Sequence, residues 1–292
     1  MFKERLGFGI QELDGMLGGG LLPGTLTVVA GATGVGKTQL GLRWANQGSI
    51  EGRRGLICDL TSRGDAQNHA AYALEQFGWQ LSQFPMDQPL NFEEMWDLTK
   101  NPGDYFHPFG KAGRRVTKRD LDPDEWHVWK TDLARVLRHS ASFFYQNFIR
   151  GSRRVVIDGI EPTDRFSESI QFEFFEYLYH HVLRKEDQWA ARELLREHYR
   201  TNQAQVISHP YDFASIGCVY LYTAPQVLLD DLMNQPITEG DIFANANTII
   251  LMGRTKQAAK FGRAIYVAKH RGSACSDEIK PYNLGERGLE FI

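Results

Sequence analysis

The chain has 292 residues, of which 42% are hydrophobic and 24% are charged, and its formal net charge is −3. This length can bury a sizeable core, either as one large domain or as a domain with insertions. The small negative net charge excludes a uniformly basic nucleic-acid-binding protein, although it does not exclude local basic patches.

The three cysteines, Cys58, Cys218 and Cys275, are widely separated and form no CxxC pair. That spacing does not favour a zinc site or a disulfide framework. The N-terminal segment Met1–Arg5 is short and charged, unlike the start of a signal peptide. No apolar run approaches the roughly 18 residues of a membrane span. We therefore expect a cytoplasmic protein with reduced cysteines and no membrane contact.

Short apolar segments rich in β-branched residues predict the strands of a mostly parallel sheet. In chain order they are Thr25–Ala30, Gly55–Asp59, Arg154–Asp158, Cys218–Tyr222, Thr248–Met252 and Ala264–Ala268. The expected helices are Lys37–Gly48, Asp65–Phe77, Asp124–Ile149 and, as one long element, Glu168–Arg200. The alternation of strands and helices favours an α/β fold built from βαβ units, with helices flanking the central sheet.

Two segments interrupt this pattern, and we interpret them as insertions at about 83–123 and 168–217 in a single domain of residues 1–292. The first is rich in proline, glycine and charge, and it contains the basic run Lys111–Arg119. The second ends in a polar link, Thr201–Gly217. The basic run could bind nucleic acid or an acidic partner, but a solvated loop is the favoured interpretation.

A glycine-rich sequence follows the first predicted strand and fits the pattern GxxxxGK[ST]. With the residue after it, it supplies the predicted nucleotide contacts Gly31, Ala32, Thr33, Gly34, Val35, Gly36, Lys37, Thr38 and Gln39. Glycines let backbone N–H groups wrap closely around a triphosphate, and the following helix adds its positive dipole end. Lys37 is expected to contact the β- and γ-phosphates, and the Thr38 hydroxyl to coordinate Mg²⁺. The sequence therefore predicts an ATP site with Mg²⁺ as its cofactor.

A P-loop site also requires a carboxylate near the magnesium ion, usually at the end of an apolar strand. The segment Arg153–Asp158 supplies one, because its strand residues end in Asp158. The alternative is an aspartate that only caps the next turn, and the P-loop favours the metal role. Thr38 and Asp158 are thus the predicted metal ligands, and Lys37 and Asp158 are predicted to act in catalysis.

Two motifs at opposite ends of the chain carry a family resemblance. Gly7–Asp14 and Leu17–Thr25, which lead into the P-loop, are similar to the pattern G-x-x-x-L-D-x-x-L-G-G-G-x-P-x-G. Val267–Ser273, Ile279–Tyr282 and Gly285–Glu290 are similar to the ending K-x-R-G-S … I-x-P … G-x-x-G-I. Both patterns are those of the KaiC branch of the RecA superfamily. The resemblance covers Met1 to about Trp79, Ser152–Asp158 and Cys218–Ile292.

The resemblance implies a RecA-like P-loop ATPase core that assembles into a ring, often a homohexamer, with ATP between neighbouring subunits. It also implies that the K-x-R pair, here Lys269 and Arg271, reaches the γ-phosphate of the adjacent subunit. Cations supplied in this way stabilise charge on the phosphates. The alternative is a pair of solvated cations at a strand end.

One departure from the family pattern concerns hydrolysis. RecA-like enzymes place a glutamate at the end of the strand after the P-loop helix, where it polarises the attacking water, and KaiC-like enzymes place two in tandem. Alignment on Gly55 puts Thr61 and Ser62 there, and neither hydroxyl is a useful base at neutral pH. Asp59, on the same strand face as Thr61, and Glu161 are the candidate replacements. We expect ATP binding with slow hydrolysis.

The sequence favours a nucleotide-dependent oligomeric switch or scaffold that presents a surface to an unidentified protein partner. The first alternative is a RecA- or RadA-type recombinase relative that acts on DNA. The segment after Asp158 is acidic rather than basic, so nucleic acid is not the favoured partner. The second alternative is an autophosphorylating kinase, as some KaiC relatives are, which the sequence neither supports nor excludes.

Overall fold

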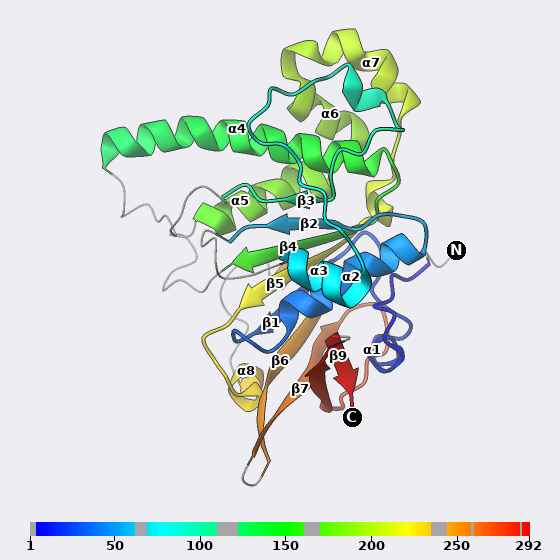
Figure 1. Cartoon of the computed structure of the whole chain (residues 1–292), viewed down its shortest axis with the longest axis vertical. Helices are drawn as coiled ribbons and strands as arrows, with labels where there is room; N and C mark the ends of the chain where they lie inside the picture. Colours follow the sequence, from blue (N-terminus) through cyan, green and yellow to red (C-terminus); the bar gives the residue numbers. More distant parts are fainter. Residues whose placement is uncertain are drawn as a thin grey trace.

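A computed structural model describes residues 4–61, 69–109, 122–160, 170–234, 244–257, 260–286 and 288–292. Their strands form a nine-stranded sheet in the order β3-β2-β4-β5-β1-β6-β7-β8-β9 (Figure 1). The strands are β1 (Leu26–Gly31), β2 (Leu56–Asp59), β3 (Tyr105–Phe106), β4 (Arg154–Ile160), β5 (Gly217–Thr223), β6 (Thr248–Gln257), β7 (Lys260–His270), β8 (Lys280–Gly285) and β9 (Gly288–Phe291). Pairing is parallel from β3 to β6 and antiparallel from β6 to β9. The prediction of a mostly parallel α/β sheet is confirmed.

Helices cover both faces of this sheet. The α-helices are α1 (Gln11–Met16), α2 (Lys37–Ile50), α3 (His69–Phe77), α4 (Pro123–Phe148), α5 (Ile170–Leu178), α6 (Asp187–Leu195), α7 (Tyr199–Ser208) and α8 (Leu229–Asn234). Shorter turns are η1 (Glu94–Trp96), η3 (Tyr179–Leu183, a π-helix), η4 (Arg196–His198) and η5 (Phe213–Ser215). Residues of α1, α2 and α3 share one hydrophobic core with the sheet, and residues of α4 to α7 share the other. None of these helices is both long and apolar enough to cross a bilayer.

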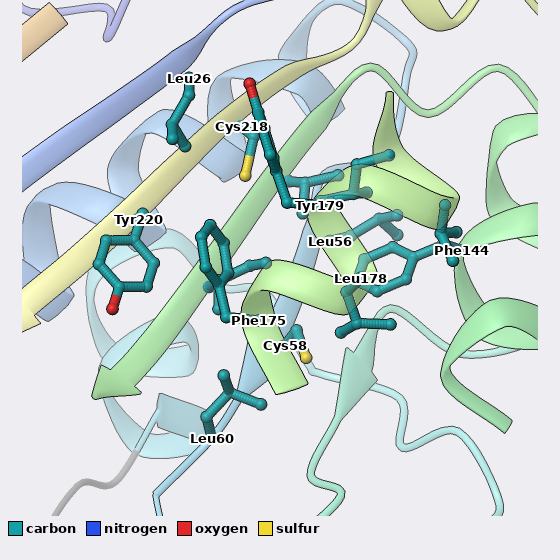
Figure 2. Packing of buried hydrophobic residues seen from close by; sticks show 14 of the residues in the cluster. Leu26, Leu56, Cys58, Leu60, Phe144, Phe175, Leu178, Tyr179, Cys218 and Tyr220 are labelled. Carbon is teal, nitrogen blue, oxygen red and sulfur yellow. The ribbon is translucent and has the colours of Figure 1, made fainter. Parts of the chain in front are cut away.

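The central strands are buried on both faces, as their continuous apolar runs predict. In β1, Val28 belongs to the core under α4 to α7, and the next residue, Val29, belongs to the core under α2. Figure 2 shows the first of these cores, where Phe175 of α5 lies against Tyr220 of β5 with ring centroids 4.3 Å apart. Because helices pack on both faces of these strands, the strands are held in place, and so are their C-terminal ends, where the P-loop and Asp158 lie.

The expected single helix Glu168–Arg200 is wrong. Within the described residues α5 passes into the π-helical turn η3, and a new helix, α6, begins at Asp187. A second break follows α6 at Arg196, a non-glycine residue with φ +48°. Apolar spacing alone did not reveal these breaks, because α5, η3 and α6 each keep buried residues facing the same core.

The expected polar link Thr201–Gly217 is also wrong in its first half, because residues 201–208 complete α7. The segment that was expected to be the first insertion contributes strand β3 at the edge of the sheet. Arg150, two residues after the end of α4, holds this segment by donating hydrogen bonds to the carbonyls of Met95, Asp97 and Lys100. The basic run Lys111–Arg119 lies outside the described residues.

Candidate functional site

The P-loop connects the end of β1 to the start of α2, as its motif requires. Gly34 and Gly36 have left-handed φ angles of +78° and +99°, a conformation that L side chains rarely adopt. A Cβ on Gly31 would lie 2.1 Å from the carbonyl oxygen of Met252 on β6. The Tyr282 hydroxyl on β8 donates a 2.6 Å hydrogen bond to the Val35 carbonyl. The loop is therefore packed against two strands. Lack of space requires glycine at position 31, and the backbone angle favours glycine at positions 34 and 36.

The two predicted metal ligands lie together, although 120 positions separate them in the sequence. Thr38 Oγ1 donates a 2.7 Å hydrogen bond to Asp158 Oδ2. The other carboxylate oxygen, Asp158 Oδ1, is buried and has no hydrogen-bond partner within the described residues. A hydroxyl next to a carboxylate, one oxygen of which accepts no hydrogen bond from the described residues, provides oxygen ligands of the kind that Mg²⁺ prefers. The residues present therefore fit the magnesium ion that a P-loop site implies.

Lys37 is the third P-loop group with a defined position. Its side chain is buried, and Nζ donates a 2.9 Å hydrogen bond to the Ala32 carbonyl across the loop. Burial lowers the pKa of Lys37 to about 8, although the charge of Asp158 acts in the opposite direction. A phosphate at the loop would add negative charge beside this ammonium and favour its charged form.

A buried histidine, which sequence reasoning missed, joins the ends of β2 and β4. Asp59 and Asp158 are register partners on these parallel strands, so their carboxylates lie side by side. His69, the first described residue of α3, lies between them, with Nδ1 3.1 Å from Asp59 Oδ2 and Nε2 3.0 Å from Asp158 Oδ2. All three residues are at most 2% exposed. The imidazole therefore separates two buried carboxylates that would otherwise repel each other.

The electrostatics of this cluster, Asp59–His69–Asp158, favour a charged histidine. Burial alone would lower the pKa of His69, but hydrogen bonding and attraction to Asp158 and Asp59 outweigh it and raise the pKa to about 10. Burial would likewise raise the pKa of Asp59, yet His69 holds it well below its usual range. At neutral pH His69 is thus an imidazolium that lies between the side chains of Asp59 and Asp158.

Asp59 has further partners that occupy its carboxylate. The Tyr105 hydroxyl of β3 donates a 2.6 Å hydrogen bond to Oδ2, and the Thr61 backbone N–H donates one of 2.9 Å to Oδ1. His107 Nε2 lies 2.8 Å from the Thr61 carbonyl oxygen and 3.3 Å from its hydroxyl. Strand β2 ends at Asp59, so the expectation that Thr61 continues the strand on the same face is wrong. The turn forms because Asp59 itself binds the Thr61 amide.

The residues that the sequence proposed as replacements for the missing glutamate have different outcomes. Asp59 lies near the site but is held by His69, Tyr105 and Thr61. Glu161 and Ser62 lie outside the described residues. Gly159, directly after Asp158, has φ +97°, and a Cβ on it would lie 2.5 Å from the Thr61 nitrogen. The two strand ends are therefore packed directly against each other at the position where the glutamate was expected.

Lys269 and Arg271 lie near one end of the strands, and their own P-loop lies at the other end. In the β6–β7 register Lys269 pairs with Ile249, whereas Met252, three residues further along β6, pairs with Gly31. Three residues correspond to about 10 Å along a strand, and the P-loop continues away from Lys269. Lys269 Nζ donates to the Ala244 carbonyl at 3.0 Å. A role across a subunit interface is compatible with this position and stays a prediction.

The lead-in motif has a structural explanation. The Asp14 carboxylate accepts hydrogen bonds from the backbone N–H groups of Phe8, Gly9 and Ile10 at 2.6, 3.0 and 3.3 Å. These bonds fix the turn that precedes α1 and place Phe8 in the core against Trp44 of α2. The motif therefore anchors the helix that follows the P-loop and does not itself contact the phosphate site.

Comparisons with known proteins agree with this site. Residues 6–105 match the family described as "ATPase: KaiC". DNA repair protein RadA from Mycobacterium tuberculosis (strain ATCC 25618 / H37Rv) is 52% identical over 48 residues, which are 16% of this chain and 10% of the relative. Circadian clock oscillator protein KaiC from Rippkaea orientalis (strain PCC 8801 / RF-1) is 31% identical over 93 residues, 32% of this chain and 15% of the relative.

The aligned parts therefore make up only 10 to 15% of the length of these curated relatives. The family match, residues 6–105, includes the apolar strand β1, the glycine loop and the helix that starts at the P-loop lysine. On these grounds residues 6–105 are similar to the ATPase domain of the KaiC family, and the chain shares with KaiC and RadA the P-loop ATPase core of the RecA superfamily over this part of its length.

Proposed function

We propose that this protein is a nucleotide-dependent oligomeric switch that binds ATP with Mg²⁺, hydrolyses it slowly and presents a surface to a partner protein. The P-loop glycines and Lys37 would hold the phosphates, and Thr38 and Asp158 would hold the magnesium ion. When bound, Mg²⁺ neutralises charge on the phosphates and helps to orient them. The remaining argument concerns which of the chain's own residues could activate a water molecule.

The observation that supports slow hydrolysis is the state of the carboxylate nearest to the expected base position. A water-activating base must accept a proton or a hydrogen bond from the attacking water. The low pKa of Asp59 makes it a weak base, and His69, Tyr105 and the Thr61 amide already use its oxygens. Thr61 offers a hydroxyl and no carboxylate. Within the described residues this corner of the site thus supplies no free base.

Steady-state phosphate release tests this proposal. We expect turnover well below about 1 s⁻¹, because water positioning and proton acceptance contribute about 10² to 10⁴-fold in rate. Thr61→Glu restores a carboxylate and is expected to accelerate release, whereas Thr61→Gln, of matched size but without a charge, is the control. A parent rate of several per second that collapses in Glu161→Gln would show that the base has moved to Glu161 and would overturn the switch.

Assembly is the second part of the proposal. If Lys269 and Arg271 act at a neighbour's phosphates, nucleotide links the subunits and favours the assembled state by mass action. The position of Lys269, away from its own P-loop, supports a contact in trans. Arg271 is exposed, as a residue that contacts a neighbour must be in the isolated chain.

Light scattering after size exclusion, with and without ATP and Mg²⁺, tests the assembly. We expect a larger species with nucleotide and a smaller one for Arg271→Ala. Lys100→Ala is the control, because Lys100 is an exposed cation that pairs locally with Glu94 at 2.9 Å. A monomer at every protein concentration and nucleotide state would exclude the ring.

The names of the relatives suggest two other activities, clock oscillation and DNA repair, but each match covers a small part of the relative. A recombinase-like activity is the second candidate, and its motivation is the 52% identity with RadA over 48 residues. Tight, salt-resistant DNA binding would favour it over the switch, because a mainly electrostatic contact weakens steeply with salt.

A further inference from the structure

Strands β6 and β7 continue beyond the rest of the sheet as a two-stranded ribbon. The pairing of β6 with β1 ends at Met252, and the pairing of β7 with β8 starts only at Arg263. Residues 255–257 and 260–262 therefore pair only with each other, and Figure 1 shows them extending past the other elements. A lone two-stranded ribbon is marginally stable in water and leaves both of its backbone edges open.

The ribbon and its continuation are strongly cationic. Between Thr248 and His270 the chain has no Asp or Glu, and its basic residues are Arg254, Lys256, Lys260, Arg263 and Lys269. Since the whole chain has a net charge of −3, the remainder carries −8. The structure thus concentrates positive charge on one projecting element of an otherwise acidic protein.

The strand register places three of these five cations, Arg254, Lys256 and Arg263, on one face. Arg254 pairs with Arg263, and Lys256 pairs with Phe261, and these positions alternate so that all four lie on the same face of the ribbon. Like charges directly opposite each other destabilise a strand pair. Phe261 is 62% exposed beside Lys256. In the isolated chain this cationic face, Arg254–Lys256–Phe261–Arg263, is therefore destabilised in two ways. Its like charges repel each other, and the apolar side chain of Phe261 is exposed to water.

Protection of an open edge by lysine is the simpler explanation, and it accounts for part of this pattern. It explains Lys256 and Lys260, which are exposed. It does not explain two opposed arginines or an exposed phenylalanine. Among the described residues no ion pair is formed by any of the cations Arg254, Lys256, Lys260 and Arg263. Asp230 and Asp231 lie on α8, which packs at the base of β6. An external segment that carries anionic groups and also covers Phe261 would relieve both the charge repulsion and the apolar exposure.

We propose that the cationic face binds a short, extended acidic segment of a partner protein, an inference that rests on the proposed switch and names the chemistry of its partner. A carboxylate-bearing strand would neutralise the opposed arginines, cover Phe261 and satisfy an open backbone edge of the ribbon. A long polyanion such as nucleic acid would also meet the acidic remainder of the chain, whereas a short segment touches the ribbon alone. Exposed charges of this kind are screened by salt.

Fluorescence anisotropy with a labelled 12-residue peptide of alternating glutamate and threonine tests the proposal on the full chain. We expect saturable binding at about 50 mM salt that weakens at least about tenfold at 0.5 M. The double variant Lys256→Ala, Phe261→Ala is expected to lose at least about tenfold in affinity, or about 1.4 kcal/mol. The matched control Lys100→Ala, Trp189→Ala, which removes an exposed cation and an exposed aromatic elsewhere, should bind like the parent.

Several results would overturn this inference. They are equal binding by the ribbon variant and the parent, equal binding of a lysine–threonine peptide, tighter binding of a 12-nucleotide oligothymidylate, or loss of binding only when the run Lys111–Arg119 is neutralised. Circular dichroism of the ribbon variant checks that the fold is retained. Lys37→Ala separates the two proposals: peptide binding that persists in this variant, whose ATP affinity is expected to be weakened, supports the ribbon independently. If the peptide experiment contradicts binding at the ribbon but ATP-dependent assembly is observed, the ribbon inference is wrong and the proposed oligomeric switch is retained.

Discussion

Removal of His69 is the sharpest perturbation of the buried charges at this site. His69→Ala leaves Asp59 and Asp158 side by side, each 1% exposed, without the cation that separates them. Breaking a buried ion pair by deleting one partner costs about 3–5 kcal/mol, because the remaining charge stays buried and uncompensated. We expect a loss of that size in the free energy of unfolding. For a chain of this length the lower limit corresponds to a fall in Tm of roughly 6–12 °C.

Urea unfolding of the nucleotide-free protein measures this loss, with two controls. His69→Gln keeps polar volume but not charge, and it should remain destabilised. His107→Ala removes a neighbouring imidazole that lies 4.0 Å from Asp59 and 2.8 Å from the Thr61 carbonyl oxygen, so it should cost about 1–3 kcal/mol, less than His69→Ala. If His69→Gln restores the parent's stability, packing rather than charge is what His69 provides.

The pH dependence has a defined sign. The pKa of His69 is about 10 in the folded protein and about 6.5 when unfolded, so its contribution is complete below about pH 6.5 and is lost as pH rises toward 10. The pKa of Asp59 is lowered, so its contribution is present above about pH 4 and is lost as pH falls. The difference between parent and His69→Ala should therefore be largest between about pH 4 and 6.5. A difference that grows from pH 7 to 10 would refute the charged-histidine argument.

The remaining predictions concern the P-loop, the strand end and the first insertion. Lys37→Ala should lose ATP affinity by about tenfold or more, equivalent to about 1.4 kcal/mol, and equal affinities in a calorimetric titration would refute the phosphate-site assignment. Gly159→Ala should destabilise the fold by about 1–3 kcal/mol, and by more than Gly151→Ala, whose φ is +88° but whose added Cβ has no neighbour within 4 Å. Arg150→Ala should speed limited proteolysis within residues 93–101, and an unchanged rate would show that its carbonyl contacts do not hold that segment.

Local sequence chemistry predicted those parts of the fold whose cause is local. The strand before the P-loop, the glycines of the loop and the helix from Lys37 follow from an apolar run, from backbone freedom and from the motif itself, and the structure has them where they were expected. Asp158 was found because a carboxylate at the end of an apolar strand has a recognisable pattern. Its contact with Thr38 follows once β1 and β4 lie in one parallel sheet.

Other features had no local signal. Strand β3 contains only Tyr105 and Phe106 in the sheet, too short to produce an alternating pattern. The breaks near Arg184 and Arg196 were hidden because the apolar stripe continues through them. His69 was expected only as one residue within a predicted helix, and nothing in its neighbourhood distinguishes it from a surface histidine.

The sequence by itself determined that this chain has a P-loop, a parallel α/β sheet and no glutamate at the usual position, because each of these is written in residues adjacent along the chain. Only the tertiary structure decided that the carboxylate of Asp59 is already engaged by other groups, since its partners His69 and Tyr105 come from α3 and from the neighbouring edge strand β3. It also decided that Arg254 opposes Arg263, because strand register, not sequence spacing, places charges face to face. Properties that depend on which groups meet across the fold require the fold itself.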